Sequence, residues 1–185
     1  MNQPQLSILI PSIPSRASKM IVLIDKLQIL VGDKKIEILC LIENKYKSIG
    51  EKRDNLVQAS TGKYIMFVDD DDDITHLNSI YSATYFNFDV ITFKSERINA
   101  DGSISIRTRN LKLSIDTKSN ENELESDFKT RLLHNCAWHN KFKKYHFPFV
   151  NDGEDVAWEK QFQNYLLTEY FVNEVIYKYN SNLEL

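Results

Sequence analysis

The chain has 185 residues, of which 42% are hydrophobic and 26% charged, with 23 Lys and Arg against 26 Asp and Glu and a formal net charge of -3. This length fits one domain spanning residues 1–185, and the acidic balance argues against a dedicated nucleic-acid binder. The apolar runs are far shorter than the roughly 20 residues of a membrane span, and no signal-peptide pattern is present, so we expect a cytoplasmic protein without a membrane span.

Two cysteines occur, Cys40 and Cys136, each among apolar residues. Two thiols alone support neither a disulfide framework nor a zinc site. We predict that both are buried.

The first part of the chain predicts strands alternating with helices. Residues 6–10 are an apolar strand, and residues 15–31 carry apolar side chains at three- and four-residue spacing, which is typical of a helix. Residues 36–42 form the next strand. Ser48 and Glu51 have the spacing of a capping box that opens a second helix. Strands joined by helices favour a parallel sheet.

The third predicted strand, residues 64–68, leads directly into five consecutive aspartates, Asp69 to Asp73. Two carboxylates about 5 Å apart repel by roughly 3 kcal/mol at an effective dielectric near 20, so the run favours loss of charge, a helix terminus or a bound cation. The alternative is a solvated acidic turn. Carboxylate oxygens suit Mg2+ or Mn2+. In open α/β sheets ligands bind at the carboxyl ends of strands, which is where this run lies.

A third helix is expected over 75–85, and the pattern then changes. Residues 89–98 and 103–113 predict an antiparallel hairpin, and 116–127 a polar loop. A short helix over 128–134, a helix over 156–167 and a strand over 170–179 follow. We find no internal repeat and no domain boundary.

Several motifs in a fixed order carry a family resemblance: LSILIPS, GEKRDNLVQASTGKYIMFVDDDDD, WHNKFKK and GEDVAW. Together they resemble a small glycosyltransferase of the GT-A fold, closest to glycosyltransferase family 2. The resemblance implies a Rossmann-like α/β fold with a mostly parallel central sheet, flanking helices and a small antiparallel hairpin. Residues 1–87 would bind a nucleotide sugar, and residues 88–185 would form the acceptor half with the catalytic base.

The implied reaction is an inverting, metal-dependent transfer of one sugar, from a UDP-sugar in particular, to an acceptor hydroxyl. The resemblance makes Asp71 the leading ligand of Mn2+ or Mg2+, with Asp69 a second ligand and His139 a further one. Asp155 would be the general base that takes the proton from the acceptor. On the sequence alone Asp155 also reads as an ordinary acid at a helix start.

The same resemblance implies a set of nucleotide-sugar contacts: Pro11, Ser12, Ile13, Arg16, Glu43, Arg53, Asp69, Asp70, Trp138, Lys141 and Glu154. Trp138 is equally typical of a core residue, and Arg53 of a helix surface. The acceptor stays open among glycans, lipids, proteins and modified nucleobases.

Two other functions fit parts of the sequence. Asp71, Asp73 and Thr75 spell the nucleophile motif of haloacid-dehalogenase-type phosphatases, in which Lys141 would steady the phosphate. A non-catalytic module that binds a sugar nucleotide is the other alternative. A calcium loop of the EF-hand type fails, because Ile74 and Ile80 occupy its glycine and glutamate positions.

Overall fold

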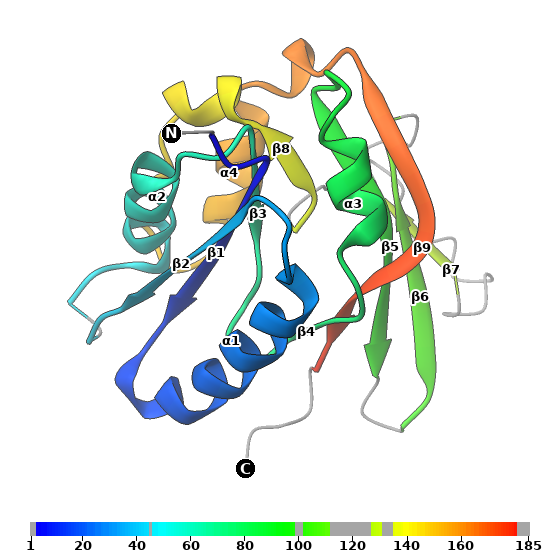
Figure 1. Cartoon of the computed structure of the whole chain (residues 1–185). Coiled ribbons are helices and arrows are strands. Elements are labelled where there is room, and N and C mark those ends of the chain that lie inside the picture. Colours follow the sequence, from blue (N-terminus) through cyan, green and yellow to red (C-terminus); the bar gives the residue numbers. More distant parts are fainter. Residues whose placement is uncertain (1–2, 45, 99–101, 112–126, 131–134, 181–185) are drawn as a thin grey trace.

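The structure is a computed structural model of the chain, and it describes residues 3–44, 46–98, 102–111, 127–130 and 135–180, with the backbone only for 127–130. Its elements form a curled sheet flanked by helices, a mixed α/β, Rossmann-like arrangement (Figure 1). Most of the paired residues lie in parallel ladders, as predicted.

The first half alternates as expected. Its strands are β1 (Leu6–Ser12), β2 (Ile36–Ile42), β3 (Tyr64–Phe67) and the short β4 (Asp73–Ile74), and its helices are η1 (Pro14–Arg16), α1 (Ala17–Val31), α2 (Ile49–Ala59) and α3 (Asn78–Ala83). Strand β1 pairs in parallel with β2 on one side and β3 on the other. The carboxyl ends of these strands therefore meet at one edge of the sheet.

The second half contains β5 (Val90–Ile98), β6 (Ile104–Arg109), β7 (Asp127–Thr130), β8 (Ala137–His139), η2 (Asn140–Lys144), α4 (Glu154–Lys160), η3 (Gln163–Tyr165) and β9 (Glu169–Tyr179). The predicted hairpin is β5 with β6, which pair antiparallel. Strand β8 inserts antiparallel between β3 and β5, and β9 runs beside β5 and β4.

Two clusters of buried side chains cover the two faces of the sheet. One packs α1, α3 and β9 against β1 and β3, and the other packs α2, α4 and a group of aromatic residues on the opposite side. Strand β3 is buried along its whole length, as predicted. The predicted cap is present, because Ser48 Oγ accepts a hydrogen bond from Glu51 N at 3.1 Å.

Three local predictions were wrong. Residues 127–130 form a strand instead of starting a helix, and 131–134 lie outside the described residues, as does most of the predicted polar loop. The helix expected over 156–167 ends at Lys160. Cys136 is buried, but Cys40 is exposed because β2 is the last strand in the sheet order and has a neighbour on one side only.

Candidate functional site

A cavity of about 340 Å³ opens where the carboxyl ends of β1 and β3 meet the first turns of α2. Its lining comprises Pro11, Ser12, Ile13, Arg16, Ile49, Lys52, Arg53, Asp69, Asp70 and Asp71. Eight of these ten residues belong to the set predicted from the sequence. Parallel strands bring them together, because consecutive carboxyl ends share one edge of the sheet.

Asp70 anchors the acidic loop to the loop after β1. Its side chain is 4% exposed, and its Oδ2 accepts a hydrogen bond from Ser12 Oγ at 2.6 Å. Arg16 Nη1 lies 3.1 Å from Asp70 Oδ1 and 2.9 Å from Asp71 Oδ2, and so links two neighbouring carboxylates. The Arg16 and Asp71 side chains are about a third exposed, which leaves them accessible from the cavity.

Arg53 connects the acidic loop to α4. Its Nη2 lies 3.1 Å from Asp69 Oδ1 and its Nη1 lies 3.3 Å from Glu154 Oε1. Both Arg53 and Glu154 are nearly buried, whereas Asp69 is one-third exposed. The motif GEDVAW is thus brought to the acidic loop through one guanidinium group.

The predicted base, Asp155, acts electrostatically on the same group of residues. Burial raises the pKa of Asp69, Arg53 opposes that rise, and the charges of Asp71, Asp70 and Asp155 raise it further. Asp155 likewise raises the pKa of Arg53, behind Asp69 and Glu154. The acids after β3 and Asp155, in the first turn of α4, therefore share one electrostatic environment.

The last two aspartates of the run, Asp72 and Asp73, are held by other parts of the chain. Asp72 Oδ2 accepts a hydrogen bond from Tyr177 Oη at 2.7 Å, and Asp72 Oδ1 accepts one from Asn180 N at 2.9 Å. Burial raises the pKa of Asp72 to about 7. Asp73 pairs instead with Lys26 on α1. The five aspartates thus divide into three that line the cavity and two that fix the loop.

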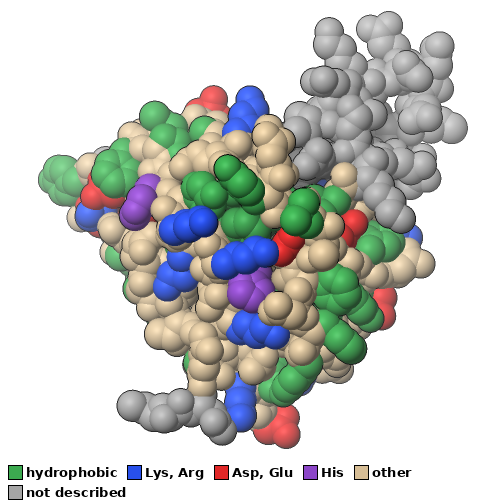
Figure 2. Space-filling model, turned by 90° about the horizontal axis from the view of Figure 1, so that it is seen from above, with side chains coloured by type: hydrophobic (Ala, Val, Ile, Leu, Met, Phe, Trp, Pro, Cys, Tyr) green, Lys and Arg blue, Asp and Glu red, His purple; other side chains and the backbone are tan. Residues whose placement is uncertain are grey.

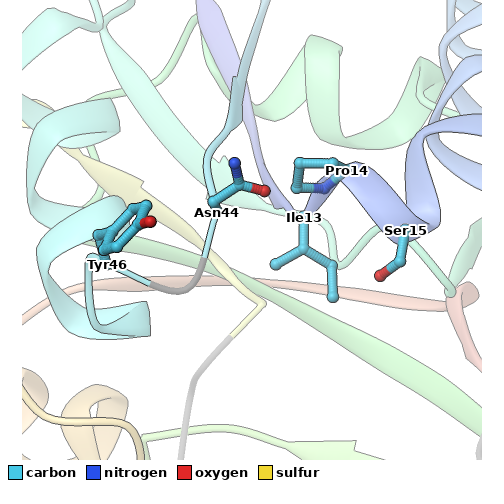
Figure 3. Close-up of a pocket in the computed structure, with 5 residues that line it drawn as sticks. All are labelled: Ile13, Pro14, Ser15, Asn44 and Tyr46. Atoms are coloured by element: carbon cyan, nitrogen blue, oxygen red, sulfur yellow. The ribbon is translucent and has the colours of Figure 1, made fainter.

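A second cavity of about 440 Å³ adjoins the first, since both are lined by Ile13. Its other lining residues are Pro14, Ser15, Asn44 and Tyr46. Figure 3 shows Asn44 and Tyr46 on one side of the opening and Ile13, Pro14 and Ser15 on the other. The Tyr46 ring is 91% exposed, so one whole face is available to a planar ligand.

Glu43, predicted in the nucleotide pocket, lies at the edge of this region. Its carboxylate accepts a hydrogen bond from Lys47 N at 3.0 Å, and its carbonyl oxygen accepts one from Lys52 Nζ at 3.1 Å. Lys52 also contacts the carbonyl of Ser12, so it joins the ends of β1 and β2. The sequence reasoning missed Lys52, although it lies next to Arg53 in the same motif.

Three predicted residues lie away from the acids. His139 pairs with Tyr64, at the amino end of β3, whereas the aspartates follow its carboxyl end. Trp138 is 1% exposed and packs edge-on against Trp158 and Phe162, so it is a core residue. Lys141 pairs with Asp89. His139, predicted as a metal ligand, and Trp138 and Lys141, predicted as nucleotide-sugar contacts, therefore do not lie beside the acids. The antiparallel strand β8 and the following η2 place them toward the other end of β3.

Tyr177 and Asn180 hold the acidic loop, and sequence reasoning did not find them. Neither lies in a recognisable motif; their roles arise only because β9 pairs with β4.

Among the described residues, no group of three His, Cys, Asp or Glu side chains converges to hold a metal ion. Asp69 and Asp71 lie on one loop and line one cavity. Each of these two carboxylates is paired with an arginine, Asp69 with Arg53 and Asp71 with Arg16.

The described helices include none with the length and apolar character needed to cross a membrane. No protein-family model matches the chain, and no curated protein matches it.

Solved structures do resemble it. Residues 1–349 of TarS from S. aureus in complex with UDP superpose with a TM-score of 0.61 at 14% identity, covering 95% of this chain and 60% of that one. The TarS complex with UDP-GlcNAc gives a TM-score of 0.59 at 14% identity, with 95% and 58% covered. The protein A197 from STIV gives 0.51 at 13% identity, with 91% and 82% covered.

The fold of this chain is similar to that of TarS. At this identity the likeness shows the fold alone, and the chain spans about 60% of the TarS fragment.

Proposed function

We propose that the protein is a glycosyltransferase that binds a nucleotide sugar, a UDP-sugar in particular, and moves one sugar to an acceptor hydroxyl with inversion. The observation that carries the proposal is the link through Arg53, which joins Asp69 to Glu154 and so brings the motif after β3 and the motif of α4 to one site. TarS, whose fold is similar, forms complexes with UDP and with UDP-GlcNAc.

The two adjoining cavities offer places for the two parts of a nucleotide diphosphate. Base and ribose fit between Tyr46, Asn44 and the loop after β1, because an exposed aromatic ring stacks on a base and an amide pairs with its edge. The diphosphate fits the neighbouring cavity, where Arg16 and Lys52 supply positive charge.

Charge balance supports a metal ion in the first cavity, of about 340 Å³, which the aspartates line. Five carboxylates, Asp69, Asp70, Asp71, Glu154 and Asp155, face three cationic side chains, Arg16, Lys52 and Arg53. A diphosphate alone would add negative charge to a site that already has an excess of it. A Mn2+ or Mg2+ ion held by Asp69 and Asp71 would offset this excess and neutralise charge on the leaving diphosphate.

Asp155 is the proposed general base. Its charge acts on Asp69 and Arg53, so its carboxylate lies near the proposed diphosphate site, and it would accept the proton of an acceptor hydroxyl that attacks the sugar from the opposite side. Glu154 is nearly buried and pairs with Arg53 through Oε1, so it is better suited to positioning.

The geometry argues against the phosphatase alternative, because the lysine that it requires does not lie near Asp71. Its phosphate-binding lysine, Lys141, is paired with Asp89 at the far end of β3 and does not line the cavity that contains Asp71. The second alternative, a module that binds a sugar nucleotide without catalysis, is distinguished from an enzyme by the donor panel described in the next paragraph.

The decisive test is calorimetry with UDP in the presence and absence of Mn2+, followed by a panel of nucleotide sugars scored by thermal shift and by hydrolysis. We expect UDP to bind only with the metal, and binding to be lost in Asp69→Asn and Asp71→Asn but kept in Asp25→Asn, an exposed acid of α1. Absence of UDP binding by the wild type would overturn the proposal. Binding without sugar transfer or hydrolysis for any donor would leave the non-catalytic module, and metal-dependent cleavage of p-nitrophenyl phosphate lost in Asp71→Asn would favour the phosphatase.

A further inference from the structure

The motif WHNKFKK, which does not lie at the candidate site, forms part of a different surface. His139 pairs with Tyr64 at the first residue of β3, and Asp69 lies five residues further along the chain. At a rise of about 3.3 Å per residue, this surface and the acidic loop are separated by roughly 16 Å along the strand. Figure 2 looks down on the end of the molecule that carries this motif.

Positive charge gathers on this end. Figure 2 shows Lys and Arg side chains around a histidine near the middle of the face, with hydrophobic side chains beside them. Lys63 and Lys141 act on His139 from two segments, and the pKa of His139 is lowered by burial and then by these two charges. Lys143 and Lys144 follow in η2. The chain as a whole is acidic, so this concentration of lysines is local.

Lys63 and Lys143 make their hydrogen bonds to carbonyl oxygens, and the charge of Glu37 also acts on Lys143. Lys63 Nζ contacts the carbonyl oxygens of Thr84 and Phe86 at 2.8 and 3.0 Å, and Lys143 Nζ contacts that of Ser60 at 2.5 Å. Carbonyl groups orient an ammonium group without neutralising it. Lys141 is the exception, because it pairs with the carboxylate of Asp89.

Two apolar side chains protrude beside the lysines. Leu167 is 81% exposed and Phe86 is 55% exposed. Their positions are fixed by the same contacts: the Phe86 carbonyl accepts from Lys63, and Leu167 N donates to the second oxygen of Asp89 at 2.6 Å. Exposed apolar side chains within a lysine cluster are the composition of surfaces that lie on anionic membranes.

We propose that the face formed by Lys63, His139, Lys141, Lys143, Lys144, Phe86 and Leu167 docks on an anionic lipid surface. The lysines attract the headgroups, and Leu167 and Phe86 enter the boundary between headgroups and acyl chains. Charge complementarity favours this occupant over a neutral membrane. The aliphatic Leu167 protrudes further than the aromatic Phe86, which favours a lipid surface over nucleic acid, whose bases stack on aromatic rings.

The docked orientation follows from the geometry. The lipid-facing surface and the acidic cavity lie at opposite ends of β3, so the cavity opens away from the bilayer. An acceptor would then be presented at some distance from the headgroups. This consequence depends on the proposed function, but lipid binding itself does not.

The test is co-sedimentation of the full chain with vesicles, without nucleotide or metal. We expect binding to vesicles of phosphatidylglycerol and phosphatidylcholine in equal parts, no binding to phosphatidylcholine alone, and weakening with added salt. Replacing Lys143 and Lys144 by Gln should weaken binding about fivefold per lysine, since each contributes about that factor near an anionic surface. Leu167→Ser should weaken it about tenfold, with the salt dependence unchanged.

The matched control is Lys19→Gln, an exposed lysine in the first turn of α1, which should bind like the wild type. Unfolding curves check that each variant is folded. Equal binding to neutral and anionic vesicles would overturn the proposal. So would release from vesicles by inorganic phosphate at constant ionic strength, which would indicate a free-phosphate site, or tighter binding to a single-stranded oligonucleotide than to anionic vesicles. Because UDP plays no part in this assay, its outcome is independent of the proposed transferase activity.

Discussion

Arg53 Nη1 lies 3.3 Å from Glu154 Oε1, although the two residues belong to separate halves of the chain. The same guanidinium group reaches Asp69. One nearly buried cation therefore holds the acidic loop and α4 in a fixed relation, and both stability and site geometry depend on it.

Arg53→Gln should lower the free energy of unfolding by about 3 kcal/mol, because it leaves carboxylates without their partner in a mostly buried position. Urea denaturation at neutral pH measures this. The control is Lys47→Gln, which breaks an exposed pair with Glu51 and should cost less than about 1 kcal/mol. Equal losses for the two variants would show that Arg53 is not the link described here.

Asp72→Asn should gain stability relative to the wild type as the pH rises from about 4 to about 7. The pKa of Asp72 is raised from 3.8 to about 7 in the folded protein. The contribution of this carboxyl to the free energy of unfolding is therefore complete below pH 4 and is lost as the pH rises through 7. The Asn variant has no such loss. Denaturation of both proteins across this range checks the prediction, with Asp152→Asn, an exposed acid before α4, as the control for removing one charge. A difference that stays constant with pH would contradict it.

Tyr46→Ala should weaken UDP binding five- to a hundredfold, the range expected for loss of one base-stacking ring. Tyr46 lines the second cavity and is 91% exposed, so it makes little contribution to the core. Calorimetry with UDP and Mn2+ measures the change. Tyr165→Ala removes an exposed tyrosine that lines neither cavity beside the acidic loop, and should leave UDP binding unchanged. If Tyr46→Ala binds UDP like the wild type, the base lies elsewhere.

Asp155→Asn should keep UDP binding and lose transfer by about a hundredfold or more, as expected for removal of a general base. The assay uses the donor and acceptor found by the screen. Asp152→Asn, at an exposed position three residues before Asp155 and outside α4, should transfer at the wild-type rate. Unchanged turnover in Asp155→Asn would remove this residue from the mechanism.

The sequence alone determined the alternation of strands and helices in the first half and the acidic loop at the end of β3. These are local properties: apolar periodicity, a capping box, and a buried strand that runs into aspartates. The family resemblance assigned Ser12, Arg16, Arg53 and Asp69 to one site. Parallel pairing of β1 with β3 brings Ser12 and Asp69 to the same edge of the sheet.

Only the tertiary structure decided which motifs share a site. Antiparallel pairing of β8 with β3 moves His139 and Lys141 to the far end of the sheet, and the pairing of β9 with β4 brings Tyr177 to Asp72. The direction and partner of a strand depend on long-range pairing, and a sequence pattern with a period of two residues is the same in either direction.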